Sequence, residues 1–233
     1  MACRHSNLLS AFSVKHASPT SFGLTYQGNP SIVRGFSLVE LLVVLAVIAI
    51  LTVAALPAIQ STLGGVNLKG GGNAVLGLMS LARQTATSRN LPVDFRMYQD
   101  ASSNNSFRLI ALVIPASASG ASTDEYIVKP VGLPGDIIID ANTTYSSLLN
   151  TSASSTLPPV SGTESSSAPL MVQGRTYVKF TFLPNGALNL DSTVKWCLSL
   201  RNQHAQASAS APAVNYIAVV LDTQSGRPST FQP

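Results

Sequence analysis

The chain has 233 residues, of which 10% are charged and 45% are apolar, and its formal net charge is +4. This length allows one membrane segment and one modest globular domain. Three of the fourteen Lys/Arg residues precede Phe36, and removing them leaves eleven against ten Asp/Glu. The charge balance therefore does not require nucleic acid or any other acidic partner.

Residues 1–35 form a candidate leader. They contain no Asp or Glu, and residues 6–31 are rich in Ser, Thr, Pro and Gly without a helical or strand period. Two explanations remain open: an extended leader that is removed, or a start codon that is assigned too early. In either case the segment does not contribute to the fold.

A long apolar segment starts at Phe36, and we expect a membrane-spanning helix over residues 36–62. Residues 41–59 supply about the length that crosses a hydrocarbon core of roughly 30 Å. Glu40 is the only ionisable side chain between residues 36 and 59, and such a charge is costly unless it is paired. Basic residues precede the segment and none follows before Lys69. The positive-inside rule therefore places the N-terminus in the cytoplasm and the C-terminal domain outside.

Three interpretations of this segment compete. A cleaved secretory signal has an apolar region of about 7–15 residues, which is shorter than this one. A plain membrane anchor fits the length but gives Glu40 no purpose. The third rests on the run Gly35-Phe36-Ser37-Leu38-Val39-Glu40 and the apolar residues behind it. This pattern resembles the type IV prepilins and the pseudopilins of type II secretion, which share a Gly-Phe junction and a glutamate at the fifth mature position.

The resemblance implies a processing and an assembly role for four residues. A prepilin peptidase would cut between Gly35 and Phe36 and N-methylate Phe36. Glu40 would pair with the Phe36 ammonium of a neighbouring subunit and set the register of a filament. Pro57 occurs where many pilins carry a proline, and a helix kink and a simple end of the span have similar support. The implied partners are prepilin peptidase, other pilins or pseudopilins, and the bacterial inner membrane.

The next segment, residues 63–90, combines a glycine-rich stretch with an amphipathic helix. Residues 63–72 hold five glycines, and each costs about 1 kcal/mol of helix propensity relative to alanine. A weakened or broken helix is therefore expected there. Helical periodicity resumes at Asn73 and ends near Arg89, before Pro92. One face of this predicted helix is apolar and consists of Val75, Leu78, Met79 and Ala82.

Residues 91–233 are predicted to form an antiparallel β domain. Val93, Phe95 and Met97 alternate with polar residues, which is typical of a half-buried strand. Further strands are expected at 107–114, 126–129, 136–140, 177–183, 194–200 and 215–221. The Ser/Thr-rich tract 141–168 has too few large apolar residues to fold alone, which predicts a mobile surface insertion. The fold class is thus α+β and pilin-like, with a long N-terminal helix packed on a C-terminal β domain.

Two turn motifs carry a second resemblance. One strand ends in Phe182-Leu183-Pro184-Asn185-Gly186, and a late strand is followed by Thr223 to Arg227, which includes Gly226. Together they resemble the H-type, FimT-like minor pseudopilins. The sequence is also similar to pilin-like proteins from large gene cassettes of Verrucomicrobia. The alternative is that each motif is an ordinary hairpin turn.

Three functional hypotheses follow. The first is a minor pilin or pseudopilin, with a periplasmic β domain, in a type II secretion-like pseudopilus or a type IV pilus. The second is a FimT-like minor pilin that binds DNA for uptake, which needs a basic patch. Only one charge stands at Gly226-Arg227 and the four residues after it, so nucleic acid is not an expected partner. The third, a membrane-tethered enzyme, has no supporting constellation, and neither a cofactor nor a metal is expected.

Overall fold

The computed structural model describes residues 35–100, 106–152, 155–205 and 211–232, with the backbone alone for residues 54–62. The chain divides into two units, residues 1–50 and residues 51–233. The fold is α+β, with an N-terminal helix packed on an antiparallel β-sheet, as predicted. The elements are α1 (Leu38–Arg89), β1 (Val93–Asp100), β2 (Ser106–Ile114), α2 (Ala116–Ser119), β3 (Glu125–Gly132), β4 (Ile137–Ile139), η1 (Ser147–Leu149), β5 (Val160–Thr163), β6 (Thr176–Phe182), β7 (Trp196–Asn202), β8 (Tyr216–Leu221) and β9 (Pro228–Phe231).

Helix α1 is 52 residues long and ends where the sequence predicted. Asn90 follows its last residue with a positive φ of 53°, the left-handed conformation that commonly terminates a helix. Over the residues that the structure describes, no helix combines the length and the apolarity needed to cross a bilayer. The side chains of residues 54–62 lie outside that description. The span over 36–62 and the kink at Pro57 therefore stay predictions.

The expected helix break at residues 63–72 was wrong, because α1 runs through them without interruption. Gly71 and Gly72 lie against the sheet. A Cβ atom at Gly71 would be 3.0 Å from Ile137 Cγ2, and one at Gly72 would be 3.2 Å from Ile217 Cδ1. The missing side chains let the helix approach β4 and β8 closely, and this packing outweighs the low helix propensity of glycine.

All strand pairs among the described residues are antiparallel, in the order β5-β6-β1-β2-β4-β7-β8-β9, with β3 also paired to β2. Strand β2 is shared: its first part pairs with β4 at Phe107, whereas residues 109–114 pair with β3. The predicted strands are all observed with small shifts at their ends. Strands β5 and β9 were not predicted.

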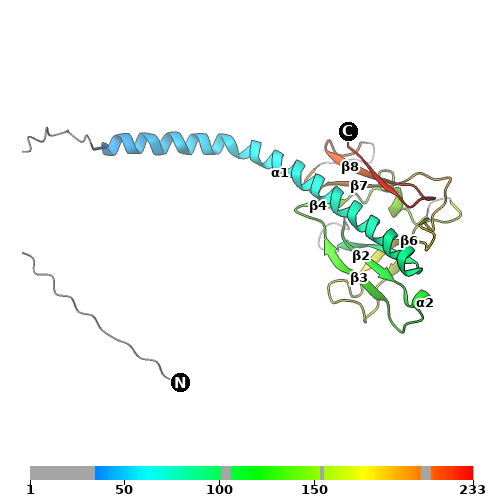
Figure 1. Ribbon diagram of the computed structural model, residues 1–233. Coiled ribbons are helices and arrows are strands. Elements are labelled where there is room, and N and C mark those ends of the chain that lie inside the picture. The colour runs from blue at the N-terminus through cyan, green and yellow to red at the C-terminus, as the bar shows by residue number, and fades with distance from the viewer. Residues whose placement is uncertain (1–34, 101–105, 153–154, 206–210, 233) are drawn as a thin grey trace, which may run out of the picture. The chain divides into compact units, whose positions relative to one another are not determined.

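The second half of α1 lies across one face of the sheet (Figure 1), and the main hydrophobic core is formed between them. Val75, Met79 and Ala82 of the helix are fully buried there, as their spacing predicted. Leu78 is only half-buried. From β1, the core receives Val93, Phe95 and Met97, and from β6 it receives Phe180 stacked on Phe95 at 5.1 Å between ring centroids.

The opposite face of the sheet is also covered, so β1 is not the half-buried strand that the alternation predicted. Asp94, Arg96 and Tyr98 on this face are all buried. Residues 164–175, which we name the cover segment, pack on this face: Ala168 and Val172 cluster with Tyr98, and Glu164 pairs with Arg96. This contact forms a second, smaller hydrophobic cluster on the face turned away from α1.

The expectation of a mobile surface insertion at residues 141–168 was wrong for the described parts, 141–152 and 155–168. Leu148 and Leu149 in η1 are buried in the main core. Residues 160–163 form β5, which pairs with β6. Strand pairing and two well-placed leucines thus give the tract contacts that its average composition did not indicate.

Candidate processing and assembly site

The start of α1 is capped by Ser37. The Ser37 hydroxyl accepts a hydrogen bond from the Glu40 N–H at 3.2 Å, and the Ser37 carbonyl accepts one from the Leu41 N–H at 3.2 Å. Ser37 is therefore the N-cap residue and Glu40 occupies the third helical position. A serine followed three residues later by a glutamate is the capping-box pattern. The sequence contained this signal at Ser37, and our sequence analysis missed it.

Gly35 and Phe36 precede the helix in non-helical backbone. Phe36 is 76% exposed, and a Cβ atom at Gly35 would meet no other atom within 4 Å. Both residues of the Gly35–Phe36 junction are thus exposed and lie outside the helix. Cleavage there would create an ammonium group one helical turn before the Glu40 carboxylate, which is also exposed.

The two turn motifs come together in the second unit. The Leu188 N–H donates to the Thr223 carbonyl at 2.8 Å. Gly186 and Gly226 both have positive φ, and a Cβ atom at Gly226 would overlap the carbonyl oxygen of Gly186. Glycine is therefore required at position 226 both by its conformation and by the close approach of the neighbouring turn. Pro184 starts the first of these turns.

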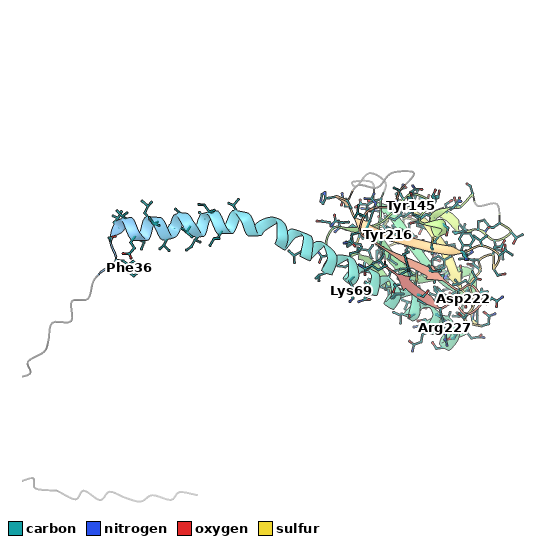
Figure 2. All side chains as sticks on the ribbon, turned by 90° about the horizontal axis from the view of Figure 1, so that it is seen from above. Phe36, Lys69, Tyr145, Tyr216, Asp222 and Arg227 are labelled. Atoms are coloured by element: carbon teal, nitrogen blue, oxygen red, sulfur yellow. The ribbon has the colours of Figure 1, made fainter. Side chains whose placement is uncertain are left out.

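Arg83 of α1 joins the helix to this pair of turns. Its Nε donates to the Ser225 carbonyl at 2.6 Å, and its guanidinium lies beside Gly186. Arg227 lies next to Asp222 across the second turn (Figure 2), where the Asp222 N–H donates to the Arg227 carbonyl at 3.1 Å. A hydrogen bond from Ser225 lowers the pKa of the Asp222 carboxyl. This arrangement fixes the orientation of the helix on the sheet.

A buried charge cluster lies under the cover segment. Arg96, whose side chain is 4% exposed, contacts Glu164 at 2.7 Å, Asp124 at 2.6 Å and Asp94 at 3.4 Å. The Tyr98 hydroxyl donates to the same Glu164 carboxylate at 2.6 Å. The Asp94 carboxylate also accepts from Lys179 at 2.7 Å and from Thr181 at 2.7 Å. The guanidinium stands 4.9 Å from the Tyr177 ring centroid. Glu164 thus anchors the cover segment to β1.

The pKa shifts in this cluster follow from burial and hydrogen bonding. Burial alone would lower the Arg96 pKa, but hydrogen bonds to Glu164 and Asp124 raise it above its ordinary value. Burial and the hydrogen bond to Glu164 raise the pKa of Tyr98. Burial opposes ionisation of Asp124, yet hydrogen bonds from the Ala116 N–H and from Arg96 lower its pKa. At neutral pH Arg96 and Asp124 are therefore charged, and Tyr98 keeps its proton.

A comparison with known protein families finds one motif, in the N-terminal part of the chain. The prokaryotic N-terminal methylation motif matches residues 31–56, which include Gly35, Phe36 and Glu40. No curated protein and no solved structure matches the chain. The motif and the α+β fold are both pilin-like. Proteins of the pilin-like family are typically non-enzymatic, and the motif suggests an association with membranes or pili. The motif implies processing by a prepilin peptidase.

Proposed function

We propose that the chain is a minor pilin or pseudopilin that assembles into a type II secretion-like pseudopilus or a type IV pilus. The observation that carries the proposal is the methylation motif on residues 31–56, which includes Gly35 and Phe36 and the start of the helix at Leu38. The precursor sits in the bacterial inner membrane as a single-pass protein, with its N-terminus in the cytoplasm and the β domain in the periplasm. The positions of the basic residues around residues 36–62 support this orientation.

Glu40 has a physical reason to act in assembly. The Phe36 ammonium that cleavage creates is charged at neutral pH, because α-amino groups have a pKa of about 7.7–8.0. Its position at the N-terminus of a helix is unfavourable, since the helix dipole already places positive charge there. Pairing with the Glu40 carboxylate of a neighbouring subunit removes this penalty on the ammonium. It also removes the cost of leaving that carboxylate unpaired in the membrane. Two subunits that are displaced by one turn lose both gains, so the pair sets the register.

The proposal is tested by the mass and the N-terminal sequence of the membrane-extracted chain, expressed with and without its prepilin peptidase. An N-methylated Phe36 that appears only with the peptidase is the expected result. Gly35→Val should block processing, whereas Gly64→Val, also at a glycine without neighbours within 4 Å, should leave it intact. A chain that starts at residue 1, or that is cut after the apolar run, contradicts the proposal.

Glu40→Gln separates assembly from processing. The variant should still be cut and methylated, but it should be absent from the sheared filament fraction. Glu125→Gln is the matched control, because it removes one exposed carboxylate elsewhere on the chain. If the Glu40→Gln chain enters filaments as well as the control does, Glu40 is not an assembly residue.

The alternative, a minor pilin that binds DNA, requires cations that are free to contact phosphates, and five cations of the second unit are already paired. Arg89, Arg96, Arg175, Lys179 and Arg201 each form an ion pair with a carboxylate. Paired cations have less attraction for phosphates, because binding must first break the ion pair. DNA retardation by the full chain at low salt would favour this alternative.

A further inference from the structure

An apolar groove opens between the second half of α1 and strands β2 and β3. Its volume is about 310 Å³. Ile110 forms the floor, and Leu78, Leu81, Val131 and Leu133 are among the walls. On the helix side the groove passes over Gly77, where a Cβ atom would meet nothing within 4 Å. Leu81 and Val131 are 38% and 44% exposed. The groove therefore presents apolar side chains to solvent and carries no charged lining residue.

The cover segment carries an apolar knob, which consists of Leu170 and Met171. Leu170 is 88% exposed and Met171 is 55% exposed. The knob is held in place, because the adjacent Val172 is fully buried and its N–H donates to the Pro169 carbonyl at 2.9 Å. Two adjacent large apolar side chains are therefore exposed at the tip of an anchored turn. Contiguous exposed apolar surface often marks an interaction site.

The knob and the groove face opposite sides of the sheet. Side chains of β2 alternate between the two faces, with Ile110 in the main core under α1 and Ala111 in the cluster under the cover segment. The groove is floored by Ile110, whereas the knob belongs to the cover segment. The knob of one molecule therefore cannot fill the groove of the same molecule.

We propose that the Leu170–Met171 knob of one copy inserts into the α1/β2/β3 groove of a second copy. A contact between two different surface patches is heterologous, and repeating it produces an open, head-to-tail row of subunits. The knob supplies two flexible aliphatic side chains, and Met adapts well to irregular apolar cavities. The inference rests on the proposed function, because it names a contact between β domains that are already aligned in a filament.

Alignment is needed because the contact is small. Two side chains in a groove bury far less than the roughly 1,200 Å² of a stable protein–protein interface. Subunits that are held together by their N-terminal helices, however, experience a high effective concentration of each other's domains. The knob and the groove would then set the spacing and the rotation of neighbouring β domains rather than drive the association.

Disulfide trapping between two differently tagged full-length copies tests the contact. One copy carries Leu170→Cys and the other Ala74→Cys at the groove, both in a background with Cys3→Ser and Cys197→Ser, co-expressed with the peptidase. Val214→Cys replaces Leu170→Cys in the control, because Val214 is an apolar residue that is 100% exposed. We expect about tenfold more mixed dimer from the Leu170 pair than from the control. Gly77→Leu, which fills the groove at an open position, should abolish the excess.

The outcomes separate this inference from the proposed function. Equal yields from the two pairs, in a chain with N-methylated Phe36, overturn the contact and leave the proposed function standing. A cross-link from Ala74→Cys to a protein of another mass also overturns it, because the groove then has a different occupant. An unprocessed Phe36 contradicts the proposed function. It overturns the contact as well, because the contact requires subunits that are aligned in a filament.

Discussion

Replacement of Arg96 by Met should strongly destabilise the β domain. The substitution keeps most of the apolar side chain and removes the guanidinium, which leaves the 4%-exposed Glu164 carboxylate and the 1%-exposed Asp94 carboxylate without that partner. Breaking a buried pair by removing one partner costs about 3–5 kcal/mol. Because domains are stable by only about 5–15 kcal/mol, the variant loses a large share of its free energy of unfolding.

The control is Arg89→Met. Arg89 forms an ion pair with Glu125 at 2.6 Å, close to the distances in the buried cluster, but the two side chains are 48% and 50% exposed. Exposed pairs contribute about 0–1 kcal/mol. Both variants remove one arginine charge, so the comparison contrasts a buried cluster of three carboxylate contacts with a single exposed ion pair.

The assay is urea unfolding of the full-length chain in detergent, followed by tryptophan fluorescence. Trp196 is the only tryptophan in the sequence and is fully buried in the main core, so its emission reports on the β domain. Adding Glu164→Gln to Arg96→Met should recover part of the loss, since it removes the unpaired charge. If Arg96→Met costs no more than Arg89→Met, the cluster does not stabilise the domain as argued.

Two further predictions concern packing and pH. Gly71→Ala should destabilise the domain by about 1–3 kcal/mol, because the new Cβ atom would be 3.0 Å from Ile137 Cγ2. Gly65→Ala should stabilise the helix by about 0.5–1 kcal/mol, because a Cβ atom there meets nothing within 4 Å. If the urea midpoints of the two variants move in the same direction, this packing argument is wrong. Hydrogen bonds, chiefly from Thr193, hold the pKa of the Asp191 carboxyl at about 2, below the value of about 3.9 in an unfolded chain. Asp191 thus contributes stability that is present above pH 4 and is lost as pH falls towards 2. In Asp191→Asn that part of the acid dependence of the unfolding midpoint should disappear.

The parts of the fold that the sequence predicted depend on regular local patterns. The alternation of Val93, Phe95 and Met97 located β1, and the spacing of Val75 and Met79 located the helix face that packs on the sheet. Both patterns arise because burial of one face imposes the period of the element on the apolar residues. The methylation motif at residues 31–56 was recognisable for a different reason, because its residues are contiguous in the sequence.

What could not be predicted depends on partners that are distant in the chain. The glycines at 71 and 72 appeared to be helix breakers, because Ile137 and Ile217, which approach them, are remote in sequence. Arg96 appeared to be a solvent-facing residue of β1, because its partner Glu164 lies 68 residues later. Local propensity and composition carry no information about such contacts, and the tract 141–168 was misjudged on the same ground.

The two strands at the ends of the sheet affect how the domain behaves when it is crowded. β5 and β9 have only four residues each, and β9 begins with Pro228. On β3, which pairs only with β2 in the described residues, Pro130 removes a hydrogen-bond donor. Long unpaired edges are templates for strand addition and amyloid-like aggregation, whereas short or proline-bearing edges are poor ones. The domain can thus be concentrated side by side with its own copies without a continuous sheet growing between them.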